Sequence, residues 1–162
     1  MLYLLDANVL ITANRDYYPL QRVPQFWDWL LDRGEAGEIK VPQEMYDEVV
    51  GGTDDASTWL QSAPVRRAMV LDEEADPALV AYVVESGYAH DLNDAELEKV
   101  GKDPFLIAYA LARPERCVVT VEVSKPTQTR ANRRVPDVCD DLDVRHCNTF
   151  ELCRHAGFST RA

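Results

Sequence analysis

Residues 2–8 read Leu-Tyr-Leu-Leu-Asp-Ala-Asn, an unbroken apolar run followed at once by a carboxylate. The four apolar residues predict a short strand that is buried on both faces, as in the middle of a parallel sheet. Ligands of open α/β sheets bind beyond the carboxyl ends of the strands, which is where Asp6 and Asn8 would lie. The alternative is that Asp6 caps a helix that begins near Val9. This stretch alone leaves both interpretations open.

Length and composition indicate one folded domain that covers residues 1–162. Hydrophobic residues make up 46% of the chain, and no apolar run approaches the ~20 residues that a membrane span needs. An acid at position 6, with no basic segment before it, is unlike a signal peptide. We therefore expect a cytoplasmic protein with no membrane partner.

The formal net charge is −11. Such a charge argues against a protein that holds nucleic acid through its overall electrostatics. It suits an acidic metal site, a basic partner protein or a solubilising surface.

The four cysteines contain no C-x-x-C pair. In a cytosolic chain we expect them to be reduced and buried. A zinc site is the alternative, although the spacing matches no standard zinc pattern. Its ligands would come from Cys139, His146, Cys147, Cys153 and His155.

Apolar runs and turn residues alternate along the chain in a way that predicts strands followed by helices. Further strands are expected at residues 39–41, 117–121 and 142–145, and helices at 9–12, 26–33, 43–50, 55–60, 77–87, 103–111 and 149–156. Residues 64–71 fit either a helix or a strand, residues 90–99 suggest a loop with a helical turn, and residues 123–134 suggest an exposed loop. This alternation predicts an α/β fold with a parallel sheet and helices on both faces.

Acids occur in four segments at the sheet edge where ligands bind. Asp6 and Glu122 each follow a core strand, and Asp103 begins an apolar helix. The fourth acid, either Glu48 or Glu44, lies on the helix 43–50. Like charges gathered in one place repel one another unless a cation compensates them. Carboxylate oxygens are ligands that Mg²⁺ and Mn²⁺ prefer, and such ions can activate water for phosphodiester cleavage.

Each acid also has a plainer interpretation. Asp103 before Pro104 would make a good helix N-cap, and Asp76-Pro77 has the same pattern with no implied chemistry. Glu122 could be an ordinary loop acid, and the glutamates of helix 43–50 could simply be solvated. Taken together, the placement of the acids favours a metal site.

Four segments resemble, in their order along the chain, the PIN-domain family of metal-dependent nucleases, which includes the VapC-type toxins. They are residues 4–8, the helix that carries Glu48, residues 103–110 and residues 118–122. More narrowly, the chain is similar to the DUF4411-type PIN-like subgroup. That narrower similarity lies in Tyr18-Pro19, Phe26-Trp27, Asp55 with Trp59, and residues 135–139.

The resemblance implies a three-layer α/β/α sandwich around a mainly parallel sheet. It also implies a Mg²⁺- or Mn²⁺-dependent endoribonuclease in which a metal-activated water attacks RNA, with the chain acting as the toxin of a type II toxin–antitoxin pair. The partners would be RNA, an antitoxin protein and a second copy of the chain. The catalytic and metal-binding acids would be Asp6, Glu48 (or less favourably Glu44), Asp103 and Glu122, supported by Asn8 and Thr120. Many relatives have an aspartate where this chain has Glu122.

Residues 123–136 contain basic side chains and no acid, which stands out in a chain of charge −11. These side chains could bind the phosphate backbone of a substrate or simply be solvated, and the sequence leaves both readings open. They are Lys125, Arg130, Arg133 and Arg134.

Two other functions remain. A phosphatase of the haloacid-dehalogenase type would use Asp6 as a covalent nucleophile, but such enzymes need a second acid two residues later, where this chain has Asn8. A PIN-like domain that has lost catalysis and acts as a binding module is the other alternative.

Overall fold

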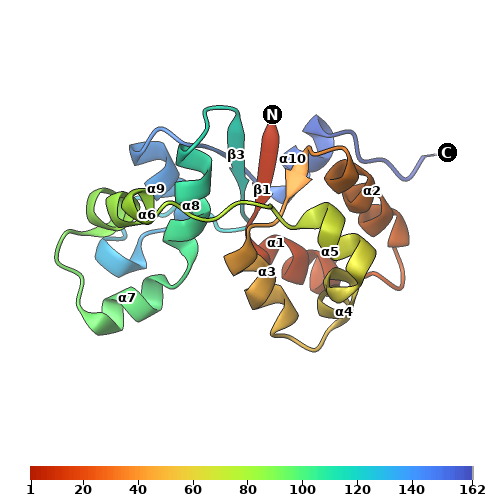
Figure 1. Cartoon of the computed structure of the whole chain (residues 1–162), viewed down its shortest axis with the longest axis horizontal. Helices are drawn as coiled ribbons and strands as arrows, with labels where there is room; N and C mark the ends of the chain where they lie inside the picture. Colours follow the sequence, from red (N-terminus) through yellow and green to blue (C-terminus); the bar gives the residue numbers. More distant parts are fainter. Residues whose placement is uncertain (162) are drawn as a thin grey trace.

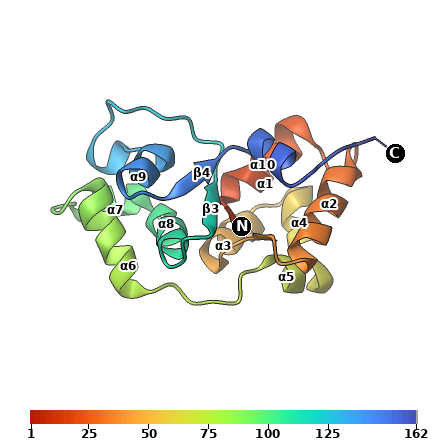
Figure 2. The same ribbon diagram turned by 90° about the horizontal axis from the view of Figure 1, so that it is seen from above.

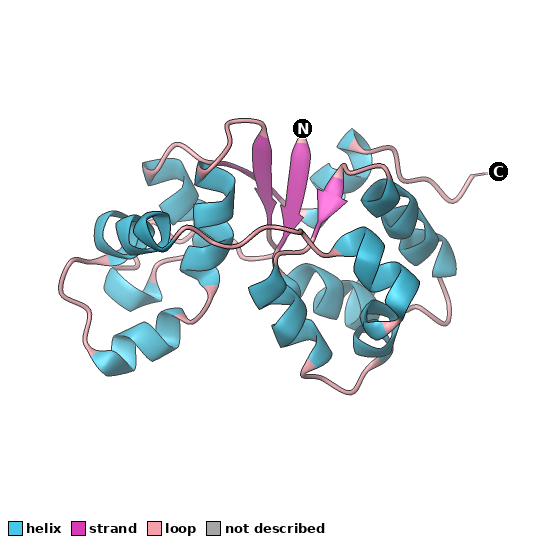
Figure 3. Ribbon diagram, viewed as in Figure 1, coloured by secondary structure: helices cyan, strands magenta, loops and turns pink. Residues whose placement is uncertain are grey.

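The computed structural model describes residues 1–161 and contains a four-stranded sheet of order β2-β1-β3-β4. All neighbouring strands are parallel, and Figure 3 shows their arrowheads directed toward the same edge. The strands are β1 (Leu2–Leu5), β2 (Ile39–Lys40), β3 (Arg116–Val119) and β4 (Arg145–Cys147). The parallel sheet predicted from the sequence is therefore confirmed.

Helices cover both faces of this sheet. They are α1 (Ala7–Thr12), α2 (Pro24–Glu35), α3 (Gln43–Val50), α4 (Asp55–Gln61), α5 (Ala63–Met69), α6 (Pro77–Tyr82), α7 (Asp94–Val100), α8 (Asp103–Leu111), α9 (Val135–Asp141) and α10 (Thr149–His155). Helices α6 to α9 lie on one side, and α1, α2, α4, α5 and α10 lie on the other (Figures 1 and 2). Helix α3 contacts both α1 and α8 near the edge to which the arrowheads point. The protein is a three-layer α/β/α sandwich, as expected.

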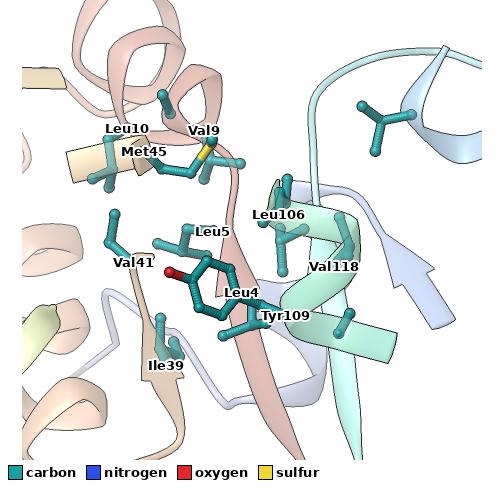
Figure 4. Packing of buried hydrophobic residues seen from close by; sticks show 14 of the residues in the cluster. Leu4, Leu5, Val9, Leu10, Ile39, Val41, Met45, Leu106, Tyr109 and Val118 are labelled. Atoms are coloured by element: carbon teal, nitrogen blue, oxygen red, sulfur yellow. The ribbon is translucent and has the colours of Figure 1, made fainter. Parts of the chain in front are cut away.

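The hydrophobic core is built around β1. Leu4 and Leu5 are fully buried, and Figure 4 shows them between β2 on one side and Leu106 and Tyr109 of α8 on the other. Burying a leucine side chain contributes roughly 1.5–3 kcal/mol. Helix α8 is apolar around most of its circumference because the sheet and other helices enclose it. Its first residue is thereby held at a fixed place beside β1 and β3.

Two helices differ from the expectation, which was a loop with a single helical turn at residues 90–99 and no helix at residues 135–141. Helix α7 occupies most of the expected loop 90–99, and a reciprocal capping box between Asn93 and Glu96 begins it. That pattern is a recognised helix-start signal, so the helical part of this segment is longer than the single turn that was expected. Helix α9 covers residues 135–141 with Pro136 in its first turn, a favoured position for proline.

The bounds of three strands also differ from the expected ones. Strand β2 ends at Lys40, and Val41 forms an isolated bridge with Val70. Strand β3 ends at Val119, so Thr120 and Val121 lie beyond it. Strand β4 begins at Arg145 instead of residue 142, because Asp143 has a positive φ of 58° that turns the chain before the strand. Residues 64–71, which fitted either structure, belong mostly to helix α5.

Two helices continue as π-helical segments, and each segment ends at a tyrosine. Helix α1 continues as η1 (Ala13–Tyr17) and α6 as η2 (Val83–Tyr88). A Cβ atom at Gly87 would lie 2.6 Å from Val138 Cγ1, so α9 packs against η2 at a distance that only glycine permits. This close contact fixes the position of Tyr88.

The four cysteines are buried and form no disulfide, as expected. No helix within residues 1–161 is both long and apolar enough to span a membrane.

Candidate functional site

Asp6 is buried at the carboxyl edge of the sheet. It directly follows β1, and its side chain is only 4% exposed. Its Oδ2 accepts a 2.9 Å hydrogen bond from the hydroxyl of Thr120, which follows the neighbouring strand β3. Its backbone N–H donates to the carbonyl oxygen of Val119. Two adjacent strands therefore hold this carboxylate in place.

Helix capping does not account for Asp6 or Asp103. Asp6 precedes α1 but makes no side-chain capping hydrogen bond, and in α8 the N-cap position belongs to Lys102, with Asp103 as the first helical residue. Asp76, which precedes a proline just as Asp103 does, accepts a 2.9 Å hydrogen bond from the N–H of Ala78. The two Asp-Pro pairs therefore have different roles, and only the one at α6 is explained by the helix itself.

The charges of four acids act on one another at this edge. Burial raises the pKa of Asp6 to about 7, although the hydrogen bond from Thr120 lowers it. The negative charges of Glu122 and Glu48 raise it further. Burial likewise raises the pKa of Asp103 to about 8, with further contributions from Asp6, Glu122 and Glu48. The structure thus brings Asp6, Glu48, Asp103 and Glu122 into one electrostatic neighbourhood, called the acid group below.

The structure separates Glu48 from Glu44. Glu48 lies in the last turns of α3, is exposed to solvent and acts on both aspartates of the acid group. Glu44 lies one turn earlier and faces Tyr109, whose pKa is raised first by burial and then by the Glu44 carboxylate. Glu44 also lines a separate cavity with Glu73. Of the two glutamates, Glu48 is the one beside the acid group.

Glu122 and Asn8 fix the chain that follows β3. The Oε2 atom of Glu122 accepts a 3.0 Å hydrogen bond from the N–H of Val135, the first residue of α9. Oδ1 of Asn8 accepts from the N–H of Val121 at 3.3 Å. Asn8 therefore holds the backbone that leads to Glu122.

Tyr88 belongs to this region and was missed by the sequence analysis. Its side chain is 8% exposed, and its buried hydroxyl has no hydrogen-bond partner among the described residues. Burial raises the pKa of Tyr88, and the charges of Asp103 and Glu122 raise it further. The hydroxyl is therefore a donor close to the acid group that the protein itself leaves unused. No local sequence pattern marks this position.

The basic residues of segment 123–136 have unequal surroundings. Arg130 pairs with Asp91 at 2.7 Å and with Glu96 at 2.9 Å. Arg133 pairs with Asp141 and donates to the carbonyl oxygen of Gly87. The guanidinium of Arg134 lies 4.0 Å from Glu122.

Lys125 is exposed, and no ion pair within residues 1–161 involves it. It is thus the basic side chain of this segment that is most available to a ligand.

The donors of the acid group suit Mg²⁺ or Mn²⁺, because all are carboxylate oxygens. Within residues 1–161, no three His, Cys, Asp or Glu side chains are grouped so that they could hold a metal ion together. The zinc site considered from the sequence is therefore not formed. Mg²⁺ usually binds through one or two carboxylates and retains several waters, so the acid group matches it in donor type without forming a closed set of ligands.

The sequence matches, over residues 3–160, the family described as a domain of unknown function, DUF4411. The chain belongs to the DUF4411 family. The match spans all four members of the acid group and confirms the similarity to DUF4411 drawn from the sequence, whereas the similarity to PIN-domain nucleases stays a prediction. No protein of curated function and no solved structure shows significant similarity to this DUF4411 chain.

Proposed function

We propose that this DUF4411 protein is a Mg²⁺- or Mn²⁺-dependent endoribonuclease with a PIN-like site. The observation that carries the proposal is the placement of a buried Asp6 and a half-buried Asp103 beside the charges of Glu48 and Glu122, at the carboxyl edge of a parallel sheet. Such an arrangement opposes folding unless protons or a cation neutralise it. Of these neutralising groups, a divalent cation could also assist phosphodiester cleavage.

The chain's own residues have distinct roles in this proposal. Asp6 and Asp103 would supply ligand oxygens from rigid positions, one tied to Thr120 and one fixed by the enclosed helix α8. Glu48, which is exposed, would face incoming substrate and solvent. When bound, a divalent ion supplies a stronger nucleophile at neutral pH and stabilises charge on the leaving oxygen. Lys125 would contact the RNA backbone.

RNA as the substrate, and the role as toxin of a toxin–antitoxin pair, are supported by the resemblance of residues 4–8, 103–110 and 118–122 to PIN-domain nucleases. The net charge of −11 adds a physical argument for a partner. A surface of this charge favours association with a basic protein segment, which an antitoxin would have to provide.

The phosphatase alternative receives less support. A covalent mechanism needs an accessible nucleophile, whereas Asp6 is 4% exposed and accepts a hydrogen bond from Thr120. The residue two positions later, Asn8, uses its side-chain oxygen to hold the N–H of Val121. These contacts favour the nuclease proposal over phosphoryl transfer through Asp6.

The test is cleavage of a mixed, end-labelled RNA panel with added Mn²⁺. We expect wild type to cleave, and Asp6→Asn and Glu48→Gln to lose about 100-fold or more in rate, equivalent to ~2.7 kcal/mol of transition-state stabilisation. Glu44→Gln is the matched control, because it removes a charge from the same helix but faces Tyr109. Equal rates for wild type and Asp6→Asn would contradict the proposed site.

Mn²⁺ binding separates the nuclease from a non-catalytic binding module. Saturable Mn²⁺ binding that is lost in Asp103→Asn, together with cleavage, supports the proposed enzyme. If wild type neither cleaves any RNA nor binds Mn²⁺ in an Asp103-dependent way, the nuclease proposal fails and the binding module is favoured.

A further inference from the structure

A cavity of about 390 Å³ lies beyond the carboxyl ends of β3 and β4. Its volume falls within the ~300–1,000 Å³ that small-ligand pockets occupy. Thr120 and Glu122 line it. The hydroxyl of Thr120 also donates to Asp6. The cavity therefore borders the acid group at Glu122, although none of the roles assigned above uses it.

One wall of the cavity is aromatic and open to solvent. Tyr17 and Phe150 are 46% and 43% exposed, and their rings meet edge to face with centroids 5.1 Å apart. Val123, 72% exposed, lines the same cavity. Three of the six exposed large hydrophobic side chains within residues 1–161 thus gather at this one place. Clustered exposed apolar surface of this kind marks a binding site.

The two rings are carried by well-defined elements. Tyr17 is the last residue of η1. Phe150 lies in the first turn of α10, where Asn148 and Glu151 form a reciprocal capping box. Rings held in this way form a binding surface without first having to be ordered by the ligand.

A buried hydroxyl beside this wall has no partner. Thr149 lines the cavity and is 2% exposed, and its Oγ1 makes no hydrogen bond to any described residue. Buried polar groups in folded proteins are nearly always hydrogen-bonded. A threonine hydroxyl can both donate and accept. Because Oγ1 is itself covered, a ligand in the cavity would pair with it after a small movement of the side chains around it, whether that ligand presents a donor or an acceptor.

We propose that this cavity binds one unpaired nucleobase of an RNA strand, with the ring against Tyr17 and Phe150 and its polar edge toward Thr149 Oγ1. The inference rests on the proposed function for its choice of RNA, and it adds a subsite that selects the nucleotide next to the cleaved phosphate. Bases of single-stranded RNA stack on such side chains and are read through their polar edges.

The occupant is a base and not a phosphate, because the carboxylates of Glu122 and Glu151 line the cavity and repel anions. An apolar side chain of a protein partner would cover the rings but leave Thr149 Oγ1 unpaired. Dependence of binding on Thr149 therefore distinguishes a base from such a side chain.

The test is binding of adenosine, guanosine, cytidine and uridine to the full chain, followed by NMR with no metal added. Nucleosides carry no phosphate, so binding reports on the cavity alone. We expect saturable binding of at least one nucleoside, weakened about tenfold by Phe150→Ala or Phe150→Leu and retained by Phe150→Tyr. Stacking on an aromatic ring commonly has an effect of this size. The leucine variant keeps an apolar contact with Tyr17 and so guards against a folding defect.

Thr149→Val should alter the preference among the four nucleosides, because it removes the hydroxyl at nearly constant volume. Glu48→Gln, which is outside the cavity, should abolish RNA cleavage and leave nucleoside binding unchanged.

No saturable binding at millimolar nucleoside, or binding that is unaffected by both Phe150→Ala and Thr149→Val, would overturn the inference. Nucleoside binding by a chain that cleaves no RNA would support the base subsite while contradicting the nuclease. Metal-dependent cleavage with the same base preference in wild type and Phe150→Ala would support the nuclease while contradicting the base subsite.

Discussion

The hydroxyl of Thr120 links two acids of the acid group. It donates a 2.9 Å hydrogen bond to Oδ2 of Asp6, and its oxygen accepts the backbone N–H of Glu122 at 3.2 Å. The bond to Asp6 favours the charged carboxylate and opposes burial, which raises the pKa of Asp6. One side chain therefore limits the rise in the pKa of the first acid and helps to position the last.

Replacing Thr120 by valine tests this link. Thr120→Val keeps the volume but removes the donor, so the pKa of Asp6 should rise further and Mn²⁺ should compete less well with protons. We expect the Mn²⁺ concentration that gives half-maximal cleavage at pH 7 to increase about tenfold, as is typical when a partner of a metal ligand is lost. Thr120→Ser retains the hydroxyl and should behave like wild type. An unchanged Mn²⁺ requirement in Thr120→Val would count against the link.

The metal-free protein should lose stability as the pH rises. The pKa values of Asp6 and Asp103, about 7 and about 8, lie above the ordinary value of 3.8. Between these limits the folded chain binds more protons than the unfolded chain, so the free energy of unfolding falls with increasing pH by up to about 1.4 kcal/mol per pH unit for each group. The stabilisation is fully present below pH 4 and is lost as the pH passes 7 to 8.

Urea denaturation in a chelator at pH 5.5 and pH 8 measures this effect. Asp103→Asn cannot ionise at that position, so its stability should fall less between the two pH values than that of wild type. Adding Mn²⁺ should stabilise wild type more at pH 8 than at pH 5.5, because fewer protons then compete for the carboxylates. Parallel pH profiles for the two proteins would show that Asp103 is not responsible.

Removing the hydroxyl of Tyr88 should have opposite effects on stability and on activity. The hydroxyl is buried and unpartnered, so Tyr88→Phe should leave the free energy of unfolding unchanged or raise it by about 1 kcal/mol. If the hydroxyl donates to substrate or water beside Asp103, the cleavage rate should fall about tenfold. Tyr82→Phe, at an exposed position of α6, is the control. A fall in both stability and rate would indicate a purely structural tyrosine.

Lys125 and Arg130 should differ in their effect on RNA binding. Lys125→Ala should weaken binding of all single-stranded RNAs to a similar extent and make the slope of log affinity against log salt shallower by about 0.7, the value for one lost phosphate contact. Arg130 is already paired with Asp91 and Glu96, so Arg130→Ala should leave the salt dependence unchanged. Equal losses in the two variants would indicate that the whole segment acts through its charge alone.

The sequence was informative wherever local pattern and topology agree. The apolar run before Asp6 and the apolar helix after Asp103 identify two enclosed elements. Because the carboxyl ends of parallel strands meet at one edge, the sequence alone was enough to predict that Asp6 and Glu122 approach each other. Helix α7 could also have been found, since Asn93 and Glu96 have the spacing of a capping box.

Other features depend on contacts between segments far apart in the chain. The spacing of Glu44 and Glu48 could not decide between them, because the decision depends on which glutamate faces Tyr109 of α8. The basic segment looked uncompensated because the acids that neutralise Arg130 lie more than thirty residues earlier. Tyr88 is placed by a π-helical turn, whose presence no pattern in the sequence indicated.

The segment between Glu122 and Val135 is tied at both ends. Oε2 of Glu122 accepts the N–H of Val135, and Asp137 accepts both the hydroxyl of Ser124 and the N–H of Lys125. The intervening residues form a closed loop whose base is fixed independently of its tip. Doubling the length of such a loop costs only about 0.6 kcal/mol of closure entropy. A reporter peptide inserted between Pro126 and Thr129, before the ion pairs that Arg130 makes with Asp91 and Glu96, should therefore leave Glu122 where it is.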